Sequence, residues 1–282
     1  MKKRISIEQG IFISLIIFTI MAIFIPGKGP DSLIVALLSV ATFLFGIFGA
    51  YILGDRNKRL VEIKETLRKD DSNFIDLYRL SVVFGKNVQK KIQKHIDNYF
   101  ISTIDHKLID YNLSAKYFLK LFDFVVKLKP KNEQQTEVYT NMINIIDQAN
   151  ENRKHLSVLI KNVMARFKWY TLIALWFVLM FSLFYINQNT FFSIVITILL
   201  SSVSVIFLLI VRDLDSLLWR EQKWIWDPLD QVFRELNLLP YYGEIIIKSE
   251  RTKLKKGSKI RVAHYPNKYP NFKGKKVKIV KI

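Results

Sequence analysis

The chain has 282 residues, half of them hydrophobic, and a formal net charge of +19. That charge is unevenly spread: +2 before residue 11, 0 in residues 26–31, +8 in residues 55–168 and +9 from residue 212 onward. All of the excess lies on one side of four apolar runs, so it indicates how a membrane protein is oriented, and we expect no nucleic-acid partner. Because cysteine is absent, disulfides and cysteine-ligated metals are excluded.

The four apolar runs predict four transmembrane helices, at residues 10–26, 32–54, 168–186 and 191–211. A spanning helix needs about 20 mainly apolar residues, and no run has a charge in its interior. The first run lacks a small-x-small cleavage site, so it is interpreted as an uncleaved span and not as a signal peptide. Connectors at residues 26–31 and 187–190 are long enough only for turns, which pairs the spans into two hairpins.

Basic residues flank the spans on one side only, which places both termini of this multi-pass protein in the cytoplasm and its spans in the cell membrane. The flanking residues are Lys2, Lys3, Arg4, Arg56, Lys58, Arg59, Arg166, Lys168 and Arg212.

The predicted fold is therefore mostly α, a polytopic membrane protein with a helical cytoplasmic region and a small strand-rich tail. We divide it into an N-terminal transmembrane hairpin (1–54), a cytoplasmic helical region (55–167), a second hairpin (168–211), a juxtamembrane helical segment (212–242) and a basic tail (243–282).

Two spans carry stripes of small or hydroxylated side chains at helical spacing. Such stripes allow close helix packing, with hydroxyls bonded to the preceding turn or to another helix. They could also line an ion path, because hydroxyls and helix dipoles pass ions without a formal charge. The candidates are Ser39, Thr42, Gly46, Gly49 and Ala50 in the second span and Ser193, Thr197, Ser201 and Ser204 in the fourth.

The cytoplasmic region reads as a series of helices. The second span is expected to continue past Leu67, with a new helix capped by Asp71 or Ser72 and weakened at Gly85. Further helices are predicted to begin near Ser114 and at Asn132.

A heptad seam, typical of coiled coils, follows Asn132 and predicts a bundle or oligomer contact. With no breaker before Asn187, we expect one unbroken helix that runs into the third span. The seam residues are Val138, Met142, Ile145, Ala149, Asn152, Leu156, Leu159 and Val163.

Beyond the fourth span, Asp213 and Asp215 oppose the helix macrodipole and are expected to pair with basic residues; ion sensing is the alternative.

The tail alternates apolar and basic residues at 244–248, 259–263 and 276–282, which predicts strands. Its lysines would meet anionic lipid headgroups, each contributing about 1 kcal/mol. RNA binding through Tyr265, Tyr269 and Phe272 is a less economical alternative.

No catalytic motif is found in the sequence. His95, His106, His155 and His264 have no metal-ligand spacing, and there is neither a phosphate-binding glycine loop nor a nucleophile elbow. We therefore expect no enzyme activity, no cofactor and no metal.

The chain has the order hairpin, helical region, hairpin, and two motifs: Asn152-Arg153-Lys154 before the third span and Arg212-Asp213-Leu214-Asp215 after the fourth. In this order and these motifs it resembles the bestrophin-like proteins of unknown function. Bestrophins proper are pentameric anion channels whose second span lines the pore, which implies that Ser39, Thr42, Gly46 and Gly49 line the path. The strand-like tail departs from that pattern.

Two functions stay open from the sequence. One is a homo-oligomeric channel for anions, with the second and fourth spans lining the path. The other is a non-conducting membrane anchor or sensor that binds a cytoplasmic partner through its helical rod and basic tail.

Overall fold

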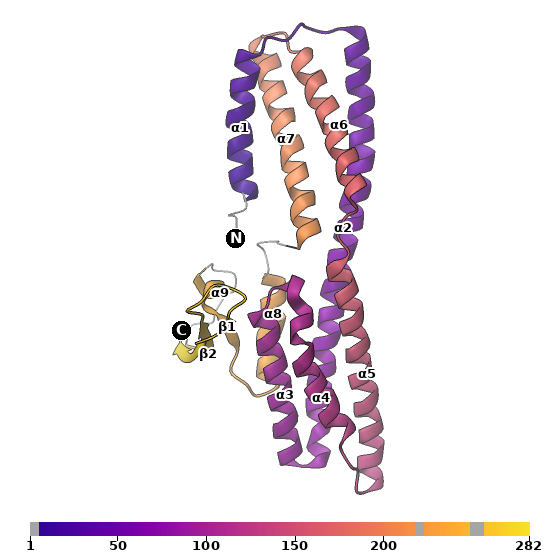
Figure 1. The fold of residues 1–282 in the computed structure, drawn as a ribbon, viewed down its shortest axis with the longest axis vertical. Coiled ribbons are helices and arrows are strands. Elements are labelled where there is room, and N and C mark those ends of the chain that lie inside the picture. Colours follow the sequence, from indigo (N-terminus) through magenta and orange to yellow (C-terminus); the bar gives the residue numbers. More distant parts are fainter. Residues whose placement is uncertain (1–5, 218–222, 249–256) are drawn as a thin grey trace. The chain divides into compact units, whose positions relative to one another are not determined.

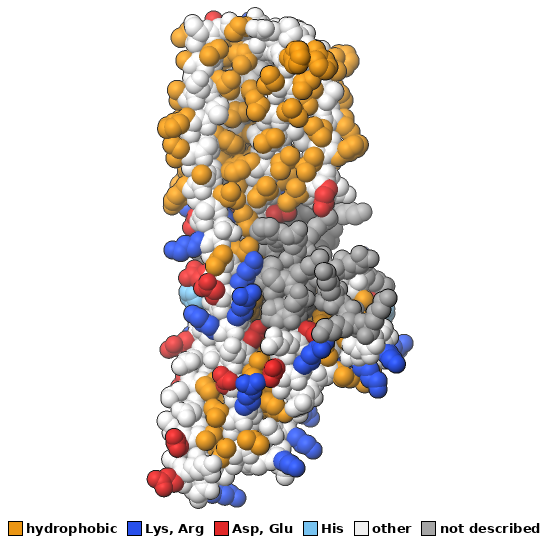
Figure 2. Space-filling model, turned by 180° about the vertical axis from the view of Figure 1, so that it is seen from behind, with side chains coloured by type: hydrophobic (Ala, Val, Ile, Leu, Met, Phe, Trp, Pro, Cys, Tyr) orange, Lys and Arg blue, Asp and Glu red, His pale blue; other side chains and the backbone are white. Residues whose placement is uncertain are grey.

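The computed structural model describes residues 6–217, 223–248 and 257–282. The chain divides into two units. We call Met1–Leu60 with Val163–Leu218 the apolar unit, and Val61–Asn162 with Trp219–Ile282 the sheet-bearing unit. Figure 2 shows hydrophobic side chains covering the first, whereas lysine, arginine and acidic side chains gather on the second.

Four helices that run side by side build the apolar unit (Figure 1). They are α1 (Ile7–Phe24), the first part of α2 (Ser32–Leu80), α6 (Arg166–Tyr185) and α7 (Phe191–Ser216). α7 packs against both α1 and α6. All four are long and apolar enough to cross a membrane, which confirms the prediction of four long apolar helices.

The two short connectors of the apolar unit contact each other. A Cβ atom at Gly27 would lie 2.1 Å from the carbonyl oxygen of Asn187, so only glycine fits there. The fully buried Asn187 donates to the carbonyl of Ala22 at 3.4 Å and accepts from the Ser193 hydroxyl at 2.8 Å. The Lys28 N–H donates to the carbonyl of Tyr185 at 2.9 Å. Both connectors therefore lie at the same end of this unit.

The second long helix does not restart where the sequence predicted. α2 continues through Asp71 and Ser72 to Leu80, because neither glycine nor proline interrupts residues 55–80. The break comes at Gly85, whose φ of 93° separates the short helix η1 (Ser81–Phe84) from α3 (Lys86–Asp105).

The next two helix starts are confirmed. After η2 (Leu108–Ser114), α4 covers Ala115–Val126, and α5 (Glu133–Lys161) begins where Asn132 accepts a hydrogen bond from the Gln135 N–H at 2.8 Å.

The predicted unbroken helix from residue 132 into the third span is wrong. α5 ends at Lys161 and α6 begins at Arg166, with Asn162 at ψ 76° and Ala165 at ψ 140° between them. The Met164 N–H, freed from helical bonding, donates to the Asp215 carboxylate at 2.7 Å. A side-chain acceptor for one backbone donor thus takes the place of about one turn of helix.

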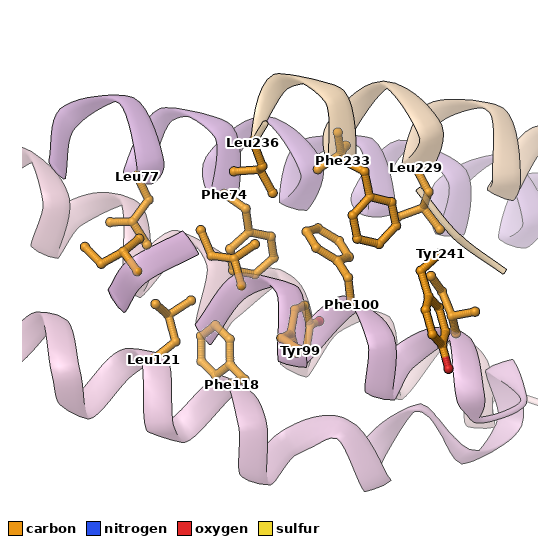
Figure 3. Packing of buried hydrophobic residues seen from close by; sticks show 14 of the residues in the cluster. Phe74, Leu77, Tyr99, Phe100, Phe118, Leu121, Leu229, Phe233, Leu236 and Tyr241 are labelled. Atoms are coloured by element: carbon orange, nitrogen blue, oxygen red, sulfur yellow. The ribbon is translucent and has the colours of Figure 1, made fainter. Parts of the chain in front are cut away.

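The core of the sheet-bearing unit contains a group of aromatic rings among aliphatic side chains (Figure 3). Phe74 of α2 lies 5.1 Å from Tyr99 and 5.4 Å from Phe100 of α3, ring centroid to ring centroid. α8 (Lys223–Glu235) adds Leu229 and Phe233 to this cluster.

Three strands form one sheet in the order β1-β2-β3. β1 (Tyr241–Gly243) is parallel to β2 (Lys259–His264), with Tyr242 opposite Val262, and β2 is antiparallel to β3 (Lys276–Lys281). Two of the three predicted strands are present. The third, at 244–248, is instead the short helix α9 (Glu244–Lys248), because three successive isoleucines do not distinguish a strand from a buried helix.

Candidate functional site

One face of α2 has no partner within the described part of the chain. Ser39, Thr42, Gly46 and Ala50 are all exposed, and a Cβ at Gly46 would meet no atom within 4 Å. The Ser39 hydroxyl donates to the carbonyl of Val35 at 2.9 Å, one turn earlier in the same helix. We call these four residues the α2 free face. It is small, weakly polar and uncharged.

Gly49 follows Thr42 by seven residues, almost two full turns, and so lies at the edge of the α2 free face, where α7 covers it. It is buried, and a Cβ there would lie 2.6 Å from Cζ of Phe207 on α7. The Phe207 ring also contacts Phe45, at 5.3 Å between centroids. Although the resemblance assigned Gly49 to an ion path, the structure places it in the contact between α2 and α7.

The hydroxyl stripe of α7 turns inward. Thr197, Ser201 and Ser204 are buried and Ser193 is half-buried. The Trp176 indole N–H of α6 donates to the Ser204 hydroxyl at 2.8 Å, and that hydroxyl donates to the Ser201 carbonyl at 2.7 Å. This placement favours the packing alternative for α7, since such hydroxyls hold helices together within lipid.

The end of α7 is held by a cluster of charges. Asp215 lies 3.2 Å from the guanidinium of Arg56 and 4.0 Å from that of Arg59, and it accepts the Met164 N–H. Asp213 pairs with Arg212 at 2.7 Å. The expected pairing of both aspartates with basic residues is confirmed. The cluster joins α2, α7 and the residues before α6.

A second buried polar group lies in the sheet-bearing unit, around Arg153. Its guanidinium carbon is 5.1 Å from the ring centroid of Tyr99, 5.0 Å from that of Tyr111 and 4.8 Å from that of Phe118. It donates to the Tyr99 hydroxyl at 2.8 Å. Nearby, the Tyr111 hydroxyl donates to Asp70 at 3.5 Å. Cation–π contacts with hydrogen bonds stabilise a charge that burial disfavours.

The motif that carries the resemblance contains Arg153, but the predicted seam of α5 left it out, because the seam shares only part of its positions with the buried face. The face of α5 that is buried consists of Met142, Ile146, Ala149, Arg153, Leu156 and Ile160, with Leu159 beside it. Of the predicted seam residues, Val138, Ile145 and Asn152 are only half-buried and Val163 is exposed. Met142 and Ala149 pack in the core of this same chain. The buried face differs from the predicted seam by one residue at every second position: Ile146, Arg153 and Ile160 take the places of Ile145, Asn152 and Leu159. A seam in this register would have included Arg153.

The tail is attached to α3 by ion pairs. Both Asp97 oxygens lie 2.7 Å from Arg261 of β2, and Lys275 lies 2.6 Å from Asp105. Phe272 packs on His106 at 5.0 Å between centroids. Arg261, Lys275 and Phe272 therefore have structural partners, whereas Lys276, Lys278 and Lys281 of β3 are exposed.

Residues 12–217 match the family described as the Bestrophin-like domain; the match begins within α1 and ends after α7, and includes neither α8 nor the sheet. No curated protein and no solved structure matches the chain.

Proposed function

The chain belongs to the Bestrophin-like family, and from this premise we propose that it forms a homo-oligomeric anion channel whose path is lined by the α2 free face. The observation that carries the proposal is that face itself: four small or hydroxylated residues, exposed along a helix apolar enough to span a membrane. Copies arranged around an axis would bring these faces together.

The chemistry of the α2 free face supports conduction. A hydroxyl such as that of Thr42 can replace part of an anion's hydration shell without a fixed countercharge, and Gly46 leaves space for the ion beside it. The net charges of +8 in residues 55–168 and +9 from residue 212 onward would concentrate anions at the cytoplasmic mouth of the channel. Anions are therefore the proposed substrate, with both termini in the cytoplasm.

The experiment is chloride flux from liposomes that contain the full-length chain. We expect flux with the natural sequence and a reduction of at least tenfold in Thr42→Leu and Gly46→Leu, because leucine fills the path. Val40→Leu is the matched control: Val40 is exposed on α2 but points away from Thr42 and Gly46, so flux should be unchanged. Absence of flux with the natural sequence contradicts the proposal.

The second candidate is a non-conducting anchor that binds a cytoplasmic partner. It is favoured by the exposed lysines of β3 and by the place of the sheet outside the family match. A monomer in mild detergent that conducts nothing, and whose sheet binds anionic vesicles or a protein, would support this function over the channel.

A further inference from the structure

A groove of about 730 Å³ runs along the outside of the apolar unit between α1 and α6, with α7 as its floor. Its α1 side extends from Gly10 through Ile17 to Lys28 in the first connector, and Val205 and Leu209 of α7 lie at its base. The volume falls within the range of about 300–1,000 Å³ that is typical of ligand sites. Apart from Ser14 and Lys28, the α1 side is apolar.

The connector end of the groove carries a positive charge. Lys28 is exposed, and its ammonium lies 5.7 Å from the ring centroid of Tyr185. Asp31, three residues later in the same connector, instead caps α2 by accepting the Leu33 N–H at 3.0 Å. A lysine and a tyrosine at the end of spanning helices are placed where lipid headgroups lie.

The walls of the groove favour a flexible apolar occupant over another helix. Helices associate in lipid through small residues that let backbones approach, whereas Phe177, Phe181 and Met180 of α6 project bulky side chains into this groove. An acyl chain can follow such a surface.

We propose that this groove binds one anionic phospholipid, with an acyl chain along α1 and the phosphate at Lys28. The site is separate from the α2 free face and does not depend on conduction.

Native mass spectrometry of the full-length chain, released from nanodiscs that contain phosphatidylglycerol, tests the proposal. We expect one retained phospholipid per chain. Ile17→Trp fills the groove at an exposed position and should remove it, whereas Leu44→Trp, at an exposed position on α2, should not. Lys28→Gln should weaken retention about fivefold, because one lysine near a membrane surface contributes that much attraction. Lys129→Gln, at an exposed position in the sheet-bearing unit, is its control.

Three results would overturn the proposal. The first is equal retention in Ile17→Trp and the natural sequence. The second is retention that is insensitive to Lys28→Gln in a variant whose thermal unfolding is unchanged. The third is a crosslink between two copies at position 17, which would show that a second chain covers the groove.

Discussion

Arg153 brings a full charge into the core of the sheet-bearing unit, with only 7% of its surface exposed. Replacing it with methionine keeps the volume but removes the donor to Tyr99 and the positive charge near Asp70. Since loss of one partner leaves other buried polar groups uncompensated, we expect a destabilisation of about 3 kcal/mol. Thermal unfolding of the purified chain, followed by circular dichroism, measures it.

The control for Arg153 is Arg79→Met. Arg79 pairs with Glu235 at 2.7 Å, but both side chains are more than a third exposed. Exposed pairs contribute about 0–1 kcal/mol, so this variant should unfold within a few degrees of the natural sequence. Equal effects of the two substitutions would contradict the role assigned to Arg153.

Because Asp70 is buried, we expect the stability of the folded chain to depend on pH in an unusual direction. Burial raises its pKa from 3.8 to about 7. Between these values the folded state binds more protons than the unfolded state, so stability decreases as the pH rises. Asp70→Asn should weaken this decrease and stabilise the chain at pH 8 by up to about 4 kcal/mol.

The matched control for Asp70→Asn is Asp76→Asn, at an exposed position on the same helix. Unfolding midpoints from pH 4 to pH 8 give the comparison. Burial raises the pKa of the adjacent Asp71 as well, so part of the slope should persist in the Asp70 variant. An unaltered slope would show that Asp70 is not the group responsible.

At the scale of the element, α2 offers two glycines in opposite settings three residues apart. Gly49→Ala places a methyl group 2.6 Å from the Phe207 ring, so the ring or the helix must shift. Overpacking of this kind costs about 1–3 kcal/mol. Gly46→Ala meets open space and should be neutral or slightly stabilising, because alanine favours helix. A stability loss at position 46 equal to that at 49 would contradict this difference in packing.

The break between α5 and α6 gives a second prediction for an element. Asp215→Ala removes the acceptor of the Met164 N–H and the partner of Arg56, and should destabilise the apolar unit by about 3 kcal/mol. Asp213→Ala affects a pair between adjacent residues and should cost less than half as much. The free energy of unfolding in detergent, measured for both variants, tests this prediction.

The elements differ in how well they could be predicted. The four apolar helices and the start at Asn132 follow from local composition and capping, and both were predicted. The end of α5 was not, because nothing in residues 162–165 breaks a helix; the cause is the distant carboxylate of Asp215. Likewise Gly46 and Gly49 belong to one small-residue stripe in sequence, and only the position of Phe207 separates them.

For the whole molecule, the contact between the two connectors requires that they lie on one side of the membrane if the four helices span it. The absence of cysteine makes this testable with single-cysteine variants. Pro30→Cys and Gln188→Cys place exposed thiols in the two connectors, whereas Lys129→Cys and Lys281→Cys place them in the sheet-bearing unit.

A membrane-impermeant maleimide applied to intact cells should label positions 30 and 188, and should label positions 129 and 281 only after the cells are opened. This pattern is expected because flanking lysines and arginines keep their segments in the cytoplasm. Labelling of only one connector would contradict the paired hairpins, since Asn187 could then not be buried against Gly27 and Ala22. Labelling of position 129 in intact cells would show that the orientation is the reverse of the expected one. The basic residues could then not concentrate anions at a cytoplasmic mouth.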